Sequence, residues 1–182
     1  ALFDAKQYSD ALAAGKDVKR DFDLEALVPV VRGEMRCRIH AHRSDDIMTA
    51  VKIAEEFHLD YTIEHCTEGY MIVDALKRHH VRATIGPYLW GPEKQELWNM
   101  SMENPGILAQ NGIDIALTAD DGSRTAYLPA TIGLLLRRGL SEKAAFEGVT
   151  IQPARTLQLE DRIGSLEPGK DADIAIFDGH PF

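Results

Sequence analysis

Residues 35–47 read MRCRIHAHRSDDI, and this short stretch contains the repeating unit from which the fold can be predicted. Residues 35–40 are rich enough in apolar and β-branched side chains, and short enough, to form a strand. Ser44 is expected to cap a following helix, whose first turn carries two acidic residues where the helix dipole favours them. The helix shows an apolar stripe at helical spacing: Ile47, Ala50, Val51, Ala54 and Phe57.

The same order of strand and helix recurs along the chain. Further strands are predicted at 61–64, 81–85 and 114–118, and Thr67 is expected to cap the helix that follows the second strand. Additional helices are predicted at 2–13, 24–31, 105–110, 126–138, 141–148 and 150–159. Strands separated by helices form parallel sheets, so we predict an α/β fold with four such units. Four units fit an open sheet or half of a (β/α)₈ barrel, because a closed barrel needs about 250 residues.

The composition narrows the class of protein. The chain has 182 residues, 45% of them hydrophobic, and a formal net charge of −9. An acidic chain is a poor match for nucleic acid or an anionic membrane, and no apolar run reaches the length of a membrane-spanning helix. With only two cysteines, a disulfide scaffold is excluded and a reducing, cytoplasmic location is expected.

Polar side chains stand where the predicted strands end. His40 follows the first strand, His65 the second and Asp120 the fourth. Because the carboxyl ends of parallel strands share one rim, we expect these three side chains to lie close together. Imidazole and carboxylate are the usual ligands of a catalytic zinc ion or a similar divalent cation. The sequence therefore predicts a metal site on this rim.

The alternation of side chains along a strand predicts which candidate residues point towards that site. Asp120 shares a face with the small Thr118 and is expected to point inward, although the neighbouring Asp121 is an alternative for the same role. We expect substrate contacts from His42, Arg43 and Glu68.

Two features of the predicted strands and loops remain open. Arg36 and Arg38 share the face of His40 and need a carboxylate partner that the sequence does not identify. Trp90 and Trp98 lie in the long loop after the third strand. We expect them to pack against the rim, with a substrate lid as the alternative.

At these residues the chain resembles the amidohydrolase superfamily, in particular its imidazolonepropionase-like and prolidase-like branch. The resemblance covers about residues 30–182, and its most specific run is IGSLEPGKDADI at 163–174. The other matching runs are RIHAHR at 38–43, DDI at 45–47, IEH at 63–65, GP at 86–87, LTAD at 117–120 and TIQPA at 150–154.

The resemblance implies a (β/α)₈ barrel with one or two divalent metal ions, zinc being expected, at its mouth. In its terms the predicted strands look like barrel strands five to eight, with His40 and His65 as metal ligands of strands five and six. Asp120 looks like the strand-eight aspartate, which touches the metal and acts as the general acid and base. A metal-activated water then attacks an amide, cyclic amide or peptide-like carbonyl, and Asp120 passes a proton to the leaving nitrogen. A deaminase of the same superfamily and a non-catalytic scaffold are the alternatives.

The chain also departs from the pattern that it resembles. It lacks the His-x-His motif of barrel strand one and the ligand of strand four, and His40-x-His42 matches the first motif in spelling only. We therefore expect a fragment, inactive alone, of an enzyme about twice as long. Its expected partners are the N-terminal half of the same protein, a small-molecule substrate and further copies of itself. Residues 1–160 would form the partial barrel, and 161–182 would lead to a small β-sandwich through a strand at 173–177.

Overall fold

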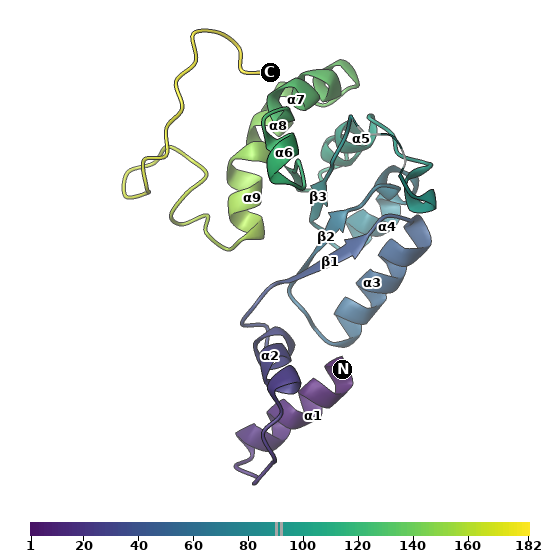
Figure 1. The fold of residues 1–182 in the computed structure, drawn as a ribbon, viewed down its shortest axis with the longest axis vertical. Helices are drawn as coiled ribbons and strands as arrows, with labels where there is room; N and C mark the ends of the chain where they lie inside the picture. The colour runs from purple at the N-terminus through teal and green to yellow at the C-terminus, as the bar shows by residue number, and fades with distance from the viewer. Residues whose placement is uncertain (90, 92) are drawn as a thin grey trace.

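A four-stranded parallel sheet forms the centre of the computed structural model, which describes residues 1–89, 91 and 93–182. The strands follow one another in the order β1-β2-β3-β4, and each pairs in parallel with its neighbour (Figure 1). Their bounds are Cys37–Ala41 for β1, Tyr61–His65 for β2, Ala83–Ile85 for β3 and Ile115–Leu117 for β4. The predicted α/β fold with a parallel sheet is confirmed.

Helices precede, connect and follow the strands. Two 3₁₀ turns, η1 (Gly69–Met71) and η2 (Gln95–Leu97), lie in the connections after β2 and β3. The α-helices are α1 (Leu2–Ala13), α2 (Phe22–Val31), α3 (Ser44–Glu56), α4 (Val73–Arg78), α5 (Asn104–Gln110), α6 (Gly122–Thr125), α7 (Leu128–Arg137), α8 (Glu142–Val149) and α9 (Ile151–Thr156). At 13 residues, α3 is the longest helix of the described chain, and none of the described helices is long and apolar enough to cross a membrane.

The two faces of the sheet differ in chemistry. Ile63, Ile85 and Leu117 lie on the face that packs against the helices, and all three are buried in the core. Helix side chains complete this core, among them Ile47, Val51, Leu76, Leu108 and Leu135. Burial of these apolar side chains is the main favourable contribution to the stability of the sheet.

The opposite face carries polar side chains, and it answers the question that the sequence left open about the arginines. Glu64 lies diagonally across from Arg38, which donates to it from Nε at 2.9 Å and Nη2 at 2.5 Å. Burial opposes ionisation of Glu64, but the guanidinium and two threonine hydroxyls together hold the pKa of this carboxyl below its usual range. Arg36 pairs with Asp60 at 2.8 Å. Both arginines therefore have carboxylate partners from the neighbouring strand or from the turn before it.

Two predicted helix caps are wrong. Arg43 occupies the N-cap position of α3, and Ser44 is the first residue of the helix. The Ser44 N–H donates a hydrogen bond of 2.7 Å to the Glu68 carboxylate. A glutamate from the next strand end thus replaces the local serine cap. Thr67 precedes the 3₁₀ turn η1 and not an α-helix, and its hydroxyl is bonded to the ring of His42 instead of capping a helix.

The predictions for the tryptophans had separate outcomes. Trp98 is 67% exposed, so the expectation that it packs against the rim is wrong. Trp90 lies outside the described residues.

The two ends of the chain lie away from the sheet. Helices α1 and α2 pack on each other, and the Tyr8 hydroxyl donates to Glu25 at 3.1 Å (Figure 1). Residues 167–170 form a turn, in which the Lys170 N–H donates to the Glu167 carbonyl at 3.2 Å.

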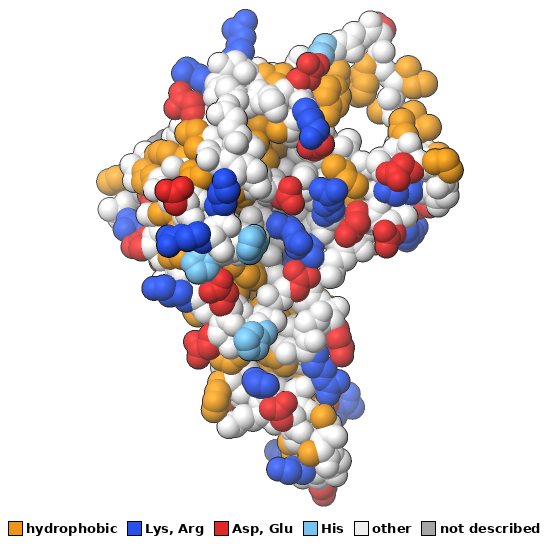
Figure 2. All heavy atoms as spheres, turned by 180° about the vertical axis from the view of Figure 1, so that it is seen from behind, with side chains coloured by type: hydrophobic (Ala, Val, Ile, Leu, Met, Phe, Trp, Pro, Cys, Tyr) orange, Lys and Arg blue, Asp and Glu red, His pale blue; other side chains and the backbone are white. Residues whose placement is uncertain are grey.

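The strand predicted at 173–177 is absent from the described structure. A strand needs a hydrogen-bonded neighbour, and no described strand lies beside this segment. Ile174 and Ile176 are 61% and 92% exposed, and Figure 2 shows apolar side chains along the projecting C-terminal loop.

Candidate active site

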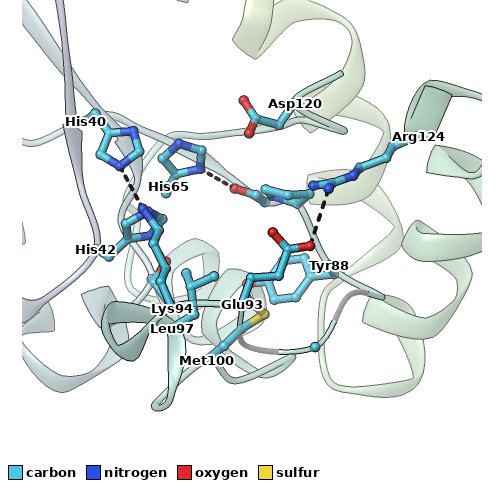
Figure 3. Close-up of a pocket in the computed structure, with 14 residues that line it drawn as sticks. His40, His42, His65, Tyr88, Glu93, Lys94, Leu97, Met100, Asp120 and Arg124 are labelled. Carbon is cyan, nitrogen blue, oxygen red and sulfur yellow. Dashed lines mark hydrogen bonds and ion pairs between the residues drawn. The ribbon is translucent and has the colours of Figure 1, made fainter. Parts of the chain in front are cut away.

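Three histidines gather at the carboxyl ends of β1 and β2. The ring centroids of His40, His42 and His65 are 4.5 to 4.6 Å apart. One ring nitrogen from each lies within 4.8 Å of the other two (Figure 3). Imidazole nitrogens in this arrangement suit zinc and other divalent transition-metal ions.

The backbone at the end of β2 places His65 in this cluster. By strand register His65 stands beside Ala41 and Ile85, whose side chains are buried in the core, so alternation alone would direct it away from the rim. Instead His65 and Cys66 adopt left-handed conformations, with φ of 70° and 43°, which non-glycine residues rarely do. Strain of this kind persists where the surrounding structure enforces it, often at functional sites.

A hydrogen bond fixes the tautomer of His65. Its Nδ1 lies 2.6 Å from the Gly86 carbonyl oxygen. Because a carbonyl can only accept, Nδ1 carries the proton and the lone pair resides on Nε2. This is the form in which a histidine binds a metal ion, with its other nitrogen held by a second partner.

Gly86 itself can only be glycine at this place. Its φ is +125°, and a Cβ atom there would lie 2.3 Å from the carbonyl oxygen of Thr118. The ends of β3 and β4 therefore approach each other closely beside His65, which is the condition under which glycine is required.

His42 is buried and has one ring nitrogen without a partner. Its Nδ1 lies 2.8 Å from the Thr67 hydroxyl, whereas Nε2 is buried and makes no hydrogen bond. Burial, followed by the nearby charges of His65, Lys94 and His40, lowers the pKa of His42 to about 4. The pKa of His40 is lowered too, first by burial and then by His65 and Lys94. Neutral imidazoles are the ligand form of histidine, so the donors present fit a cation.

A lysine ammonium already stands beside the cluster. Lys94 Nζ lies 3.4 Å from His40 Nε2 and 2.7 Å from the Glu96 carboxylate. The ammonium can only donate, so Nε2 of His40 is an acceptor that faces a positive charge in this structure. Nε2 of His40 thus already faces a cationic group, as a metal-binding nitrogen would.

Asp120 lies on the same rim but outside the histidine cluster. It lines the cavity in front of the histidines (Figure 3) and adopts a left-handed φ of 64°. Asp121 has a different position, because its side chain caps α6 by accepting from the Arg124 N–H at 2.8 Å and from Ser123 at 2.6 Å. The structure thus directs Asp120 to the cavity and commits Asp121 to the helix start.

Arg43 and Glu68 are not among the residues that line the cavity. Arg43 pairs with Asp45 through two hydrogen bonds of 3.0 and 3.1 Å. Glu68 accepts from Ser44 and from the side-chain amide of Asn99 at 2.8 Å, so it ties three segments together. Their predicted substrate contacts remain predictions.

Some wall residues escaped the sequence analysis. The cavity is lined by His40, His42, His65, Thr67, Gly86, Pro87, Tyr88, Gly91, Glu93, Lys94, Leu97, Met100, Asp120 and Arg124. The position of Thr67 two residues beyond His65 was a usable signal for a rim residue. Lys94 and Arg124 carry no such signal, because a long loop and a short helix bring them to the wall.

Comparison with known proteins shows which family and which solved structures this chain is similar to. The sequence pattern of the Amidohydrolase family matches residues 34–181. An amidohydrolase structure from Thermotoga maritima MSB8 superposes with a TM-score of 0.92 at 38% identity, over 99% of this chain and 49% of that one.

Two curated relatives are similar over shorter stretches. Adenine deaminase 2 of Jannaschia sp. (strain CCS1) is 44% identical over 71 residues, 36% of this chain and 11% of its own length. Imidazolonepropionase of Geobacillus thermodenitrificans (strain NG80-2) is 39% identical over 74 residues, 38% of this chain and 18% of its own. The chain thus spans about half of the Thermotoga protein and a smaller part of these curated relatives.

Proposed function

Because the chain belongs to the amidohydrolase family, we propose that it is part of a metal-dependent hydrolase that cleaves a carbon–nitrogen bond. The substrate class is an amide, a cyclic amide or a peptide-like small molecule. The cofactor is a divalent cation, zinc in the first place, held as one or two ions. The observation that carries the proposal is the cluster of three imidazoles on the rim, with one buried nitrogen unpartnered.

The proposed ligands are His40, His65 and Asp120. Imidazole nitrogens and a carboxylate oxygen form a donor set that suits zinc. When bound, such a cation supplies a water nucleophile that is acidic near neutral pH and polarises the carbonyl under attack. The close approach of Gly86 to the Thr118 carbonyl brings the ends of β3 and β4 together beside His65.

The chain's own residues supply the proton transfers in this proposal. Asp120 accepts a proton from the attacking water at its carboxylate and returns it to the nitrogen that leaves. We prefer Asp120 to Asp121 because Asp121 is engaged by the α6 N–H, by Ser123 and by the Arg124 guanidinium at 2.8 Å. The buried Tyr88 and the side chains of Leu97 and Met100 give the cavity an apolar wall.

A second candidate function is deamination by the same groups. The specific observation in its favour is the 44% identity to adenine deaminase 2 over 71 residues. In that case the attacked carbon belongs to an aromatic amidine and the leaving group is ammonia. Arg43, Glu68 and His42 stay proposed substrate contacts under both functions.

The proposal extends to the setting of the chain. We propose that β1 to β4 are strands five to eight of a (β/α)₈ barrel, with 1–160 as the barrel part. Residues 161–182 then lead into a small β-sandwich, where 173–177 finds a partner strand. The N-terminal half of the protein and further copies of the chain are the proposed partners, and the cytoplasm is the proposed location.

A pair of adjacent variants tests the function. The full-length protein, in which this chain is joined to its N-terminal half, is supplied with zinc and assayed for amine release from N-acyl amino acids, cyclic amides and dipeptides, and for ammonia release from adenine. Asp120→Asn should lower turnover about 10²- to 10⁴-fold, the usual contribution of a general acid and base. Asp121→Asn is the matched control, because asparagine is as good an N-cap as aspartate.

Two results would count against the proposal. One is equal turnover by the Asp120→Asn variant and the unaltered protein. The other is a complete lack of hydrolysis or deamination across the substrate panel by protein that contains stoichiometric zinc.

A further inference from the structure

We propose that His42 is a third metal ligand, so that three imidazole nitrogens of this chain hold the cation. The inference rests on the proposed metal site but changes its ligand set, since His42 was expected only as a substrate contact. It also changes the role of Asp120, whose carboxylate would contribute to proton transfer more than to metal affinity.

The first observation in favour of this third ligand is the position of the His42 ring. It follows His40 by two residues, and its ring stacks on that of His65 at a centroid distance of 4.6 Å and an interplanar angle of 21°. A ring nitrogen of His42 lies within 4.8 Å of ring nitrogens from both other histidines. Asp120 is not a member of this cluster.

The unpartnered nitrogen carries the second step. His42 is 5% exposed, and its Nε2 makes no hydrogen bond among the described residues. A buried polar atom without a partner is costly, so native structures nearly always provide one. Ring nitrogens of the other two histidines lie within 4.8 Å of a ring nitrogen of His42, and a cation bound among them would give Nε2 of His42 a partner.

Thr67 carries the third step. Its hydroxyl lies 2.8 Å from Nδ1 of His42 in the buried space behind the ring. When Nδ1–H donates to this hydroxyl, the lone pair of His42 is left on Nε2. The bond from His65 to the Gly86 carbonyl has the same effect on its own ring. Metal-binding histidines are commonly oriented in this way by a partner on the second nitrogen.

The closure that binding requires is small. Zinc–nitrogen bonds of about 2.0–2.1 Å place two tetrahedral ligands about 3.4 Å apart. The nitrogens here lie within 4.8 Å, so ring rotation by a fraction of that distance completes the site. His40 is the exposed member of the three and has the freedom to make this movement.

The experiment compares metal affinity among four variants by calorimetric titration with zinc. His42→Gln removes the proposed ligand, Thr67→Val removes only the hydroxyl that orients it, and Asp120→Asn removes the carboxylate. His79→Gln is the control, since His79 is a surface histidine bonded to Glu55 at 2.6 Å. Thermal unfolding of each variant without metal identifies any that fails to fold. Two-dimensional NMR of the imidazole nitrogens then reports which nitrogen shifts when zinc is added.

We expect zinc affinity to fall by more than tenfold in His42→Gln and by about tenfold in Thr67→Val, with Nε2 of His42 shifting on zinc addition. His79→Gln should change the affinity by less than about threefold, and Asp120→Asn should weaken binding by less than His42→Gln does. The inference is overturned if folded Thr67→Val binds zinc like the unaltered protein, if Nε2 of His42 does not shift, or if Asp120→Asn weakens binding more than His42→Gln. Each of these results leaves the proposed hydrolysis intact, because that proposal is judged by turnover and not by the third ligand.

Discussion

The rim of the sheet and the C-terminal segment were both predicted from short motifs, but only the rim has the structure expected of it. At the rim, His65 is held by the Gly86 carbonyl and His42 by Thr67, and both side chains are buried. In the C-terminal segment, residues 173–177 form no strand and Ile176 is 92% exposed. On the rim, Nδ1 of His42 and Nδ1 of His65 both find partners within the described chain, whereas the C-terminal segment finds no partner strand there.

A short motif specifies structure by itself only where the same chain supplies the groups that it contacts. Rim positions are set by neighbouring strand ends, by close backbone contacts and by buried hydrogen bonds that this chain supplies. A β-strand at a chain end depends on a second strand, whose residues need not be near it in sequence. We therefore expect substitutions at the rim to lower the free energy of unfolding strongly and substitutions in the C-terminal segment to change it little.

The largest expected effect is from Gly86→Ala. Its Cβ would overlap the Thr118 carbonyl at 2.3 Å, and alanine disfavours a φ of +125°. We expect the free energy of unfolding to fall by more than about 3 kcal/mol, measured by urea denaturation. Gly112→Ala is the control, because Gly112 has a φ of +77° with open space around it, and should cost about 1 kcal/mol. Equal losses in the two variants would show that the close approach of the strand ends is unimportant.

Asn104→Leu should destabilise the rim, because the Asn104 side chain holds the backbone that follows β2. Asn104 is fully buried, donates to the Cys66 carbonyl at 3.1 Å and accepts from the Tyr70 N–H at 2.9 Å. Leucine leaves both backbone groups unpaired beside the left-handed residues 65 and 66, so we expect a loss of about 2 to 3 kcal/mol. Chemical denaturation measures it. Asn111→Leu, which removes an exposed amide bonded within its own helix, should cost much less; a similar cost would contradict the role of Asn104.

The contact of the C-terminal tip with the body should depend on pH. The Glu142 carboxylate and then the Phe182 carbonyl raise the pKa of His180 above its ordinary value of 6.5. The attraction is therefore complete below pH 6.5 and is lost as pH rises through the raised pKa.

The NMR signals of Phe182, whose ring lies 4.9 Å from Phe146, measure this contact. They should move towards those of an unattached tip as pH rises. Glu142→Gln should remove the pH dependence, and an unchanged dependence in that variant would contradict the pairing.

The smallest effect is expected from Ile176→Asp. The exposed Ile176 side chain makes few packing contacts that the substitution could remove. The free energy of unfolding should therefore change by less than about 0.5 kcal/mol. Ile85→Val is the comparison within the sheet, where Ile85 is 1% exposed and the change should cost about 1 kcal/mol. If Ile176→Asp costs more than Ile85→Val, the segment is packed in solution and the contrast with the rim is wrong.

Much of the fold could be predicted because local signals are strong in this sequence. The strand before His40 and the acid-led helix after it are neighbours along the chain, so alternation and dipole preferences identify them without tertiary information. The errors at Ser44 and Thr67 share one cause. Glu68 and His42, each distant in sequence, compete successfully for the groups that local capping would have used.

The candidate site could be predicted in part. The sequence placed His40, His65 and Asp120 at strand ends, and the structure puts all three on one cavity wall. It could not show that His65 departs from strand alternation, because that depends on a left-handed backbone. Nor could it place Lys94, since a long loop returns this residue to the first strand end.

Anomalous X-ray diffraction would show whether the rim of this sheet binds the catalytic cation. Crystals grown with zinc are measured on both sides of the zinc absorption edge. The account predicts an anomalous peak about 2.1 Å from Nε2 of His65 and from a ring nitrogen of His40, on the cavity side of both rings. A fully zinc-supplied crystal with no peak at this rim, or with peaks only at surface histidines such as His58 and His79, would contradict it.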